Sequence, residues 1–236
     1  MRTTLYPRHL GRVIVTGGAA GLGAAVAAAV AEGGGSPAVI DLDVSSVPDQ
    51  CAARAADVSD RPALERAIEE LAEELGGIDA IVTAAGIDRC GRLDDVAAEE
   101  WERVIGVNLL GTVSAVRAAL PHIAQAHGRI VTVASSLALR ALPDATAYCA
   151  SKFGVLGFSR ALAAETRGRV GVTTLIPAGM RTGFFDDRPE QYRPAPDAQL
   201  VEADDVARAV VFALQQPPRC EVRELVICPE EEPSWP

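Results

Sequence analysis

Six short apolar runs, rich in β-branched residues, alternate along the chain with longer Ala- and Leu-rich segments, and this alternation limits the fold more than any other feature. The runs fall at 12–17, 37–43, 79–86, 129–136, 170–177 and 224–229. Continuous apolar strands separated by helices indicate a parallel sheet that is covered on both faces. We therefore predict an α/β fold built on a doubly wound parallel sheet.

The segments between the runs have helical spacing. We expect helices at 22–32, 61–75, 98–120, 145–166 and 203–216. Asp60 should cap the second of these helices, and Pro121 should end the third. The stretch 180–202, rich in Pro, Asp and Arg, fits no regular element and has the length of a functional lid. No linker divides the 236 residues, so we expect a single domain.

Composition argues against several classes of function. The net charge is −10, and no block of Lys or Arg could follow a nucleic-acid backbone, so we expect no nucleic-acid partner. No run of about 18 apolar residues lacks polar breaks, and nothing near the first strand resembles a secretion signal. We therefore expect no membrane partner and a cytoplasmic location. The five cysteines form no CxxC pair and have no paired histidines, so neither a disulfide framework nor a metal site is expected.

A glycine-rich turn, TGGAAGLG at 16–23, joins the first apolar run to the first helix. Glycines allow a tight turn and close approach of a ligand, and the helix N-terminus offers free N–H groups to a pyrophosphate. Asp41 lies 18 positions after Gly23, where a carboxylate can accept hydrogen bonds from ribose hydroxyls and repel a 2′-phosphate. This spacing predicts a Rossmann-type site for NAD. An exposed loop acid is the alternative interpretation of Asp41, and Asp43 is a nearby competitor.

Tyr148 and Lys152 lie four residues apart, and Ser135 precedes the tyrosine by 13 residues. A phenol near a fixed ammonium has its anion stabilised, so a tyrosine with an ordinary pKa of about 10 could exchange protons at working pH. Taken alone, such a pair more often marks a solvated helix face, and a serine after a strand more often belongs to a turn. In combination with the glycine-rich turn, the three residues indicate alcohol and carbonyl chemistry.

Over about residues 11–230 the chain resembles the classical subfamily of the short-chain dehydrogenase/reductase family. The matching segments are Thr16, Gly17, Gly21, Leu22 and Gly23 in the glycine motif, Asp57 and Val58 after the third strand, Ala84, Ala85 and Gly86 after the fourth, and Pro177, Gly179 and Thr182 after the sixth. The resemblance implies that these residues, with Asp41, Tyr148 and Lys152, bind the cofactor.

The resemblance also implies a catalytic set of Asn108, Ser135, Tyr148 and Lys152. Tyr148 would give or take the hydroxyl proton during hydride transfer between a nicotinamide and a carbonyl carbon, and Ser135 would hydrogen-bond the substrate oxygen. Lys152 would lower the pKa of Tyr148 and hold the nicotinamide ribose. Asn108 would hold a water that connects Lys152 to solvent. Ser136 competes for the serine role, but its spacing from the strand and from Tyr148 is less favourable.

Two positions depart from the family pattern. Thr83 stands where the family has asparagine, and we expect a structural compromise near the sheet centre rather than loss of activity. Ala178 stands where the family has glycine, so a methyl group and a restricted φ are added next to the implied nicotinamide site. Gly179 is expected to supply conformational freedom one residue later.

We therefore predict an NAD(H)-dependent oxidoreductase acting on a small or medium secondary alcohol or ketone. The nearest alternative is an NADP(H)-dependent ketoreductase of secondary metabolism, and a non-catalytic dinucleotide-binding regulator is the alternative from another class. Within the lid, Arg188, Tyr192 and Arg193 are conceivable substrate contacts, although charged loop residues are more often solvated. Trp101, Glu102 and Arg103 are interpreted as a helix face or subunit contact.

The helices at 98–120 and 145–166 carry more apolar positions than packing on one sheet requires, including Val104, Val107, Val113, Val116, Phe153, Leu156 and Phe158. In the resembling family these helices pair across a two-fold axis, so we expect a homodimer or homotetramer. Trp235, next to the C-terminus, would fit either an interface anchor or a frayed tail.

Overall fold

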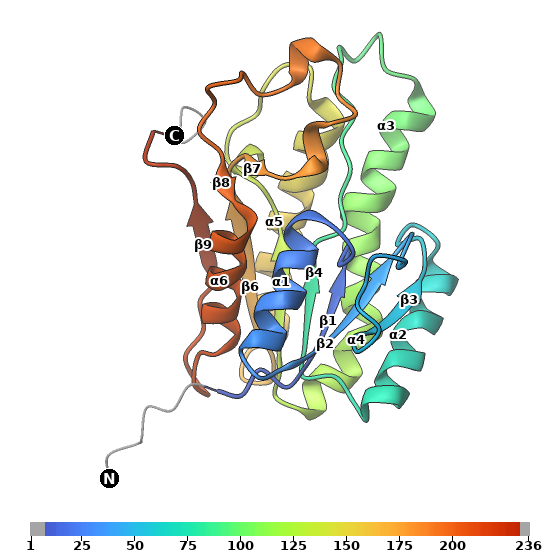
Figure 1. Ribbon diagram of the computed structural model, residues 1–236, viewed down its shortest axis with the longest axis vertical. Coiled ribbons are helices and arrows are strands. Elements are labelled where there is room, and N and C mark those ends of the chain that lie inside the picture. The colour runs from blue at the N-terminus through green and yellow to red at the C-terminus, as the bar shows by residue number, and fades with distance from the viewer. Residues whose placement is uncertain (1–7, 232–236) are drawn as a thin grey trace.

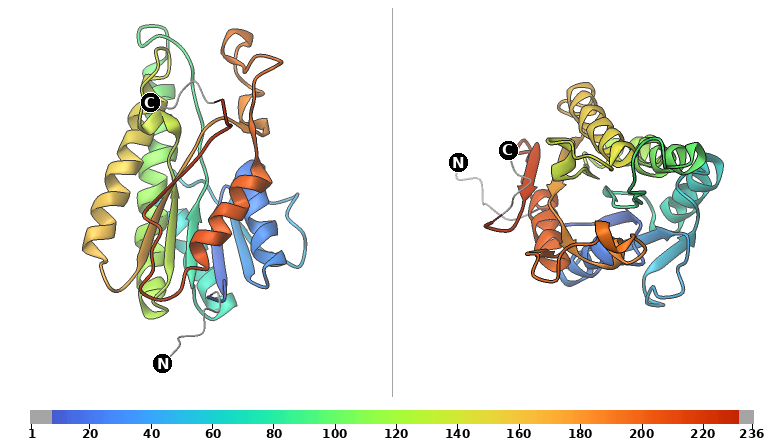
Figure 2. Two further views of the ribbon diagram at one scale, coloured as in Figure 1. Left: turned by 90° about the vertical axis from the view of Figure 1, so that its left-hand side faces the viewer. Right: turned by 90° about the horizontal axis from the view of Figure 1, so that it is seen from above.

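The computed structural model describes residues 8–231, so Trp235 lies outside the described part of the chain. A seven-stranded parallel sheet lies between two layers of helices (Figures 1 and 2), and its strand order is β3-β2-β1-β4-β5-β6-β9. The strands are β1 (Arg12–Thr16), β2 (Ser36–Asp41), β3 (Ala52–Ala55), β4 (Ala80–Thr83), β5 (Arg129–Val133), β6 (Gly171–Pro177) and β9 (Glu224–Ile227). The predicted α/β fold with a doubly wound parallel sheet is confirmed.

Helices cover both faces of the sheet, as the left view of Figure 2 shows. One face carries α1 (Gly21–Glu32) and α6 (Ala203–Leu214). The other carries α2 (Arg61–Leu75), α3 (Ala98–Ile105), α4 (Thr112–Gln125) and α5 (Thr146–Glu165). Successive side chains of a strand point to opposite faces, so Ile14 packs in the core beneath α2 and α4, whereas Val13 and Val15 pack beneath α1 and α6. The expected cap of α2 is present, since Asp60 Oδ1 accepts a hydrogen bond from Ala63 N at 3.1 Å.

The structure corrects three details of the sequence prediction. Strand β3 was missed because its sequence, AARA, has no β-branched residue and forms an edge of the sheet next to β2. Pro121 does not end its helix, because α4 continues through it to Gln125. The stretch 180–202 contains short elements: β7 (Met180–Arg181) pairs with β8 (Val201–Glu202), and the helical turns η3 (Gly183–Phe185) and η4 (Glu190–Tyr192) lie between them.

A π-helical turn, η1 (Gly106–Gly111), joins α3 to α4 in one continuous helix. By length and composition alone, this 28-residue helix from Ala98 to Gln125 could cross a membrane. The core helix of a soluble protein passes the same test, and here α4 packs on α2 and β4.

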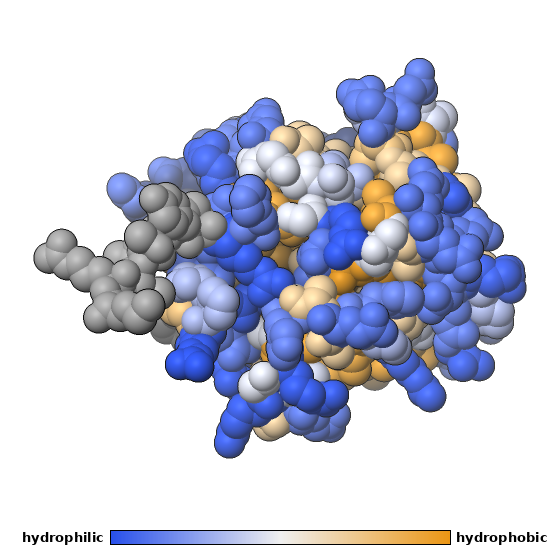
Figure 3. All heavy atoms as spheres, turned by 90° about the horizontal axis from the view of Figure 1, so that it is seen from below, coloured by the Kyte–Doolittle hydropathy of each residue, from blue (hydrophilic) through white to orange (hydrophobic). Residues whose placement is uncertain are grey.

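The carboxyl ends of the strands and the segment 180–202 lie at the same end of the molecule, at the top of Figure 1. The strand order reverses between β1 and β4, which have β2 and β5 as their outer neighbours. In open α/β sheets, ligands bind outside the carboxyl ends of the strands at such a switch point. Figure 3 shows the opposite end, where hydrophilic side chains surround smaller apolar areas. The topology therefore directs the search for a site to the upper end.

Candidate active site

A cavity of about 600 Å³ opens at the carboxyl ends of the strands. Most of the predicted site residues line it: Gly17, Gly21, Leu22, Gly23, Asp41, Asp57, Val58, Ala84, Ala85, Gly86, Ser135, Tyr148, Lys152, Pro177, Gly179 and Thr182. Thr16 and Asn108 are buried behind this wall. Residues from six strand ends and from the helices α1, α3 and α5 are thus brought to one cavity.

The glycine-rich turn keeps the backbone close to the cavity. Gly17 has a φ of 67°, and a Cβ placed on it would lie 2.6 Å from the Ala85 Cα. A Cβ on Gly23 would lie 1.9 Å from the Gly17 carbonyl oxygen. Both positions therefore exclude any side chain. Because the N-cap residue of α1 is Ala20, which has no side-chain acceptor, the first N–H groups of this helix are available to an anion.

Asp41, and not Asp43, lies at the cavity. Asp41 ends β2, and its Oδ2 accepts a hydrogen bond from Ala19 N at 2.9 Å while its Oδ1 accepts one from Leu42 N at 2.7 Å. These bonds hold the carboxylate beside the glycine-rich turn. Asp43 instead accepts from Ser45 N at 2.9 Å, and this bond lowers the pKa of the Asp43 carboxyl.

One end of the cavity, called here the far end, is lined by Asp57, Val58 and two residues of the long helix, Arg103 and Val107. Asp57 accepts hydrogen bonds from Ser59 N at 2.8 Å and Ser59 Oγ at 2.6 Å, which lower the pKa of the Asp57 carboxyl. The charge of Arg103 lowers this pKa further. The sequence interpretation assigned Arg103 to a helix face or subunit contact, and no motif signalled its place at the cavity.

Ser135 and Tyr148 lie together at the other end of the cavity, called here the inner end. Ser135 is buried after β5, its Oγ accepts a hydrogen bond from Leu137 N at 3.1 Å, and it forms a hydrogen bond with Tyr148. This contact favours Ser135 over Ser136 as the partner of the tyrosine. Burial raises the pKa of Tyr148 to about 12, although the hydrogen bond with Ser135 opposes that rise.

Lys152 is buried one helical turn after Tyr148 on α5. Its Nζ donates to the Val133 carbonyl at 2.8 Å and lies 5.5 Å from the centroid of the Tyr148 ring. Burial lowers the pKa of Lys152 to about 8. The net shift of the Tyr148 pKa is upward, and burial of the phenol is its largest cause. The lowering of this pKa by Lys152 that the family resemblance implies remains a proposal.

Asn108 lies in the π-helical turn, and turns of this kind are frequent at functional sites. Its Oδ1 accepts from Ile87 N at 2.8 Å, and its Nδ2 donates to Ile87 O at 2.9 Å and to Ser151 Oγ at 3.0 Å. A Cβ placed on Gly86 would lie 3.4 Å from Asn108 Oδ1 and 3.7 Å from Lys152 Nζ. Asn108 and Lys152 therefore both lie beside Gly86, and Asn108 fastens the loop after β4 to α5 through Ile87 and Ser151.

The two departures from the family pattern have different structural outcomes. At the Pro177–Gly179 segment, neither Ala178 nor Gly179 is among the residues with positive φ in the described part of the chain, so alanine is accommodated without strain. The Ala178 N–H donates to Ile227 O at 2.9 Å. Thr83 is the compromise that we expected, because its buried Oγ1 has no hydrogen-bond partner among residues 8–231.

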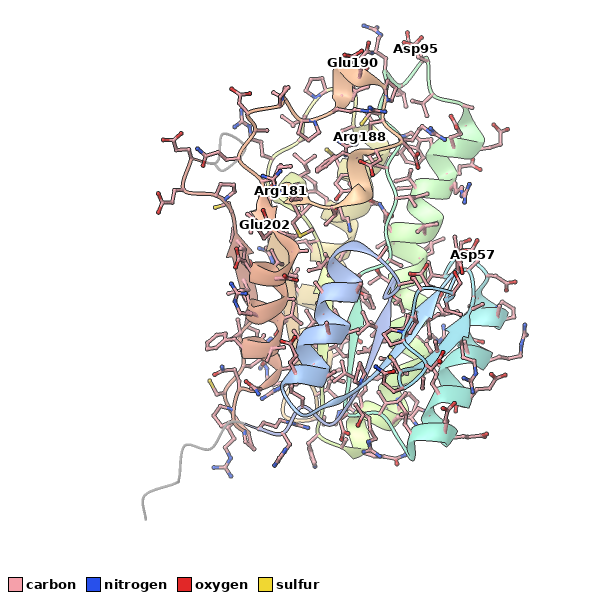
Figure 4. The ribbon with its side chains drawn as sticks, viewed as in Figure 1. Asp57, Asp95, Arg181, Arg188, Glu190 and Glu202 are labelled. Atoms are coloured by element: carbon pink, nitrogen blue, oxygen red, sulfur yellow. The ribbon has the colours of Figure 1, made fainter. Side chains whose placement is uncertain are left out.

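The segment 180–202 covers the inner end of the cavity. Phe184, Phe185 and Arg188 line the cavity, and the Phe184 ring lies 5.9 Å from the Tyr148 ring between centroids. Figure 4 shows Arg188 below the upper part of this segment, close to the chain that leads into α3. Tyr192 and Arg193, the other conceivable substrate contacts, do not line the cavity.

Residues 8–231 contain no group of three or more His, Cys, Asp or Glu side chains placed to hold a metal ion. The donors that line the cavity are instead backbone N–H groups, hydroxyls, the ammonium of Lys152 and the guanidinium groups of Arg103 and Arg188. Such a set suits a phosphate-containing organic ligand and proton transfer at a hydroxyl or carbonyl.

The chain is similar to known proteins over most of its length. A family model described as short chain dehydrogenase matches residues 11–193. A D-threitol dehydrogenase of Mycolicibacterium smegmatis is 35% identical over 217 residues, covering 84% of this chain and 84% of that protein. A glycine betaine reductase of Emericella nidulans is 31% identical over 93% of this chain, but the match spans 19% of that protein. An alcohol dehydrogenase of Thermococcus sibiricus, solved in complex with 5-hydroxy-NADP, has a TM-score of 0.84 at 26% identity and covers 92% of this chain and 96% of its own.

Proposed function

Because the chain belongs to the short-chain dehydrogenase/reductase family, we propose that it uses NAD(H) to interconvert a small or medium secondary alcohol and the corresponding ketone. Family membership establishes the reaction class: the chain is an oxidoreductase that transfers a hydride between a nicotinamide cofactor and an alcohol or ketone. The finer proposal rests on one cavity that has Asp41 near one end and Ser135, Tyr148 and Lys152 at the other.

The residues around the cavity fit a nicotinamide dinucleotide. Gly17 and Gly23 leave no room for side chains, and the uncapped N-terminus of α1 would hold the pyrophosphate. Asp57 and Val58 would bind the adenine, and Thr182 the carboxamide at the opposite end. The bound nicotinamide would donate or accept the hydride.

The position of Asp41 supports NAD(H) over NADP(H). Its carboxylate would accept hydrogen bonds from the adenosine ribose and repel a 2′-phosphate. The two residues that follow, Leu42 and Asp43, add no positive charge. One observation favours NADP(H) as the second candidate. The guanidinium of Arg103 lines the same cavity as Asp41 and could pair with a 2′-phosphate.

Tyr148 would exchange the proton at the substrate oxygen. With its pKa raised to about 12, the phenol is protonated at neutral pH and is ready to donate to the oxygen of a ketone as that ketone is reduced. Ser135 would donate a hydrogen bond to the same oxygen and stabilise its developing charge. Lys152, with a pKa of about 8, can hold or release a proton within the working range and would replace the proton that Tyr148 gives up. Asn108 would keep Lys152 and the loop after β4 in place, and the predicted water beside it remains part of the proposal.

Assembly as a homodimer or homotetramer remains a proposal, with a weaker basis than the sequence indicated. Val104, Val107, Val116 and Leu156 are buried within the chain, so they provide no intersubunit surface. The larger apolar side chains left exposed on these helices are Leu110 on η1 and Phe153 on α5, with exposed fractions of 57% and 45%. The elements that carry them pack together. The cytoplasm remains the predicted location.

Titration with NADH and with NADPH, followed by intrinsic fluorescence, tests the cofactor assignment. We expect tighter binding of NADH, and tighter binding of NADPH would favour the second candidate. Screening secondary alcohols and ketones by the absorbance of the reduced nicotinamide tests the substrate class. Cofactor binding without turnover of any compound would instead support the regulator alternative.

A further inference from the structure

Asp88, in the loop after β4, is a buried carboxylate that no sequence motif explains. Its side chain is 4% exposed, and it accepts hydrogen bonds from Arg188 Nη2 at 2.5 Å, Arg89 N at 2.7 Å and Cys90 Sγ at 3.2 Å. A buried charge is retained at low cost only when it is paired and hydrogen-bonded. Arg188, which comes from the lid 100 residues later, supplies the pairing charge.

Arg188 is held on several sides. Nη1 donates to Tyr192 O at 3.3 Å, and Cζ lies 5.4 Å from the Phe184 ring centroid and 4.6 Å from that of Phe185. Its Nε is buried and has no hydrogen-bond acceptor among the described residues. The guanidinium is therefore fixed between one carboxylate and two aromatic faces, an arrangement that suits arginine and not lysine.

A second contact fastens the same part of the lid. Tyr192 donates from its hydroxyl to Asp144 Oδ2 at 3.3 Å, four residues before Tyr148. Arg193, in contrast, donates to the carbonyls of Arg188 and Asp186 and so bonds within the lid itself. At the base of the lid, Arg181 and Glu202 form an ion pair at 2.8 Å between β7 and β8 (Figure 4). Arg188 is thus the lid cation that reaches the body of the protein at the inner end of the cavity.

We propose that Asp88 and Arg188 are positioning residues for the reaction: their ion pair seats Phe184 and Phe185 as the wall of the substrate cavity, and their opposite charges set the electrostatic field at Tyr148. This inference rests on the proposed function, because it assigns the proton transfer to Tyr148. The ion pair joins the lid to the loop that also carries Gly86 and Ile87 of the cavity wall. Without the pair, the aromatic wall would lose its main polar attachment.

The two charges act on Tyr148 in opposite directions. Asp88 raises the pKa of the phenol, and Arg188 lowers it. Asp88 also raises the pKa of Lys152. The other titratable groups around the pair are Asp144, which accepts from Tyr192, and the thiols of Cys90 and Cys149, of which Cys90 has its pKa raised to about 12 by burial.

The first readout is the pH dependence of kcat/KM for Asp88→Asn and Arg188→Met. Removing the negative charge should shift the apparent pKa of the profile down, and removing the positive charge should shift it up. The double variant should return toward the parent profile. Arg193→Met is the matched control, since it removes a lid cation that does not line the cavity, and it should leave the profile unchanged.

The second readout is how firmly the lid is held on the body of the protein. It is measured by amide hydrogen exchange over residues 183–192 and by the KM for the substrate. Both single variants and the double variant should exchange about tenfold faster or more in this segment and show a raised KM. Arg188→Lys should keep the parent pH profile but share the raised KM, because it retains the charge and loses the fixed stacking.

Shifts of the pH profile in the same direction for Asp88→Asn and Arg188→Met, or no shifts, would overturn the electrostatic role. Unchanged exchange and KM in all variants would overturn the positioning role. If the parent protein turns over no alcohol or ketone, the proposed function fails, and hydrogen exchange still decides whether the ion pair seats the lid.

Discussion

Thr83 and Thr132 are register partners on β4 and β5, yet only one of the two hydroxyls has a hydrogen-bond partner within residues 8–231. Thr132 Oγ1 lies 2.6 Å from Ser159 Oγ, which in turn donates to Val155 O at 2.7 Å. Thr83 Oγ1 is buried and has no partner in the described part of the chain. The departure from the family's asparagine therefore leaves one unsatisfied hydroxyl in the centre of the sheet.

Replacing Thr83 with valine should leave the free energy of unfolding unchanged or raise it by up to about 1 kcal/mol, because an unpaired buried hydroxyl is exchanged for a methyl group. Thr132→Val is the matched control and should lower the free energy by about 1–2 kcal/mol, since it removes a bonded hydroxyl. Urea unfolding of both variants measures the difference. A loss of stability in Thr83→Val as large as that of the control would mean that Thr83 Oγ1 is bonded in solution.

The sequence predicted most of the sheet, its helices and most of the residues that line the cavity, because the patterns that carry them are local. Apolar runs such as 12–17 indicate strands, and a glycine-rich turn with an acid after the next strand predicts a cofactor site. Edge strand β3 was not predicted, because its sequence, AARA, has no pattern typical of a strand. The prediction that Pro121 ends its helix was wrong, because a proline can remain within a helix where packing holds the next turn.

The remaining site residues could not be predicted because they depend on contacts between distant segments. The Asp88–Arg188 pair joins positions 100 residues apart, and neither residue belongs to a local motif. Arg103 reaches the cavity only because the long helix passes its far end. The pKa of Tyr148 depends on burial, which a spacing of four residues from Lys152 does not reveal.

Asp41→Ala should narrow the preference for NADH over NADPH by about tenfold or more, because it removes the carboxylate that repels a 2′-phosphate. Asp43→Ala is the control, since Asp43 lies outside the cavity and should leave the preference unchanged. Fluorescence titrations of both variants with both cofactors provide the measurement. An equal effect of the two substitutions would remove Asp41 from the ribose site.

The low pKa of Lys152 predicts a particular pH dependence of stability. Burial lowers this pKa from 10.5 to about 8, so between these values the native protein has released a proton that the unfolded chain retains. Because the unfolded state then binds more protons, the free energy of unfolding of the parent should rise relative to that of Lys152→Met between about pH 8 and about pH 10.5. Parallel urea unfolding curves test this, and a constant difference across that range would show that the Lys152 pKa is not lowered.

The oligomeric state can be measured by light scattering at micromolar concentration. Exposed Leu110 and Phe153 lead us to expect a dimer or tetramer of the 24.6 kDa chain. Phe153→Glu should then shift the measured mass toward that of the monomer. Phe212→Glu tests whether the exposed Phe212 side chain on α6 also takes part in assembly. A monomeric parent protein would contradict the helix-pairing proposal.

The most direct test of the account is the turnover of Tyr148→Phe with an alcohol or ketone accepted by the parent. This change removes one hydroxyl and leaves the aromatic contact with Phe184 and the cavity wall in place. We predict that kcat falls by a factor of about 100 or more while the dissociation constant of the cofactor changes little, because acid–base catalysis typically contributes that much. Tyr192→Phe is the matched control for the loss of a phenol hydroxyl and should retain most of the parent kcat. Turnover of Tyr148→Phe near the parent rate would show that Tyr148 does not transfer the proton and would contradict the proposed mechanism.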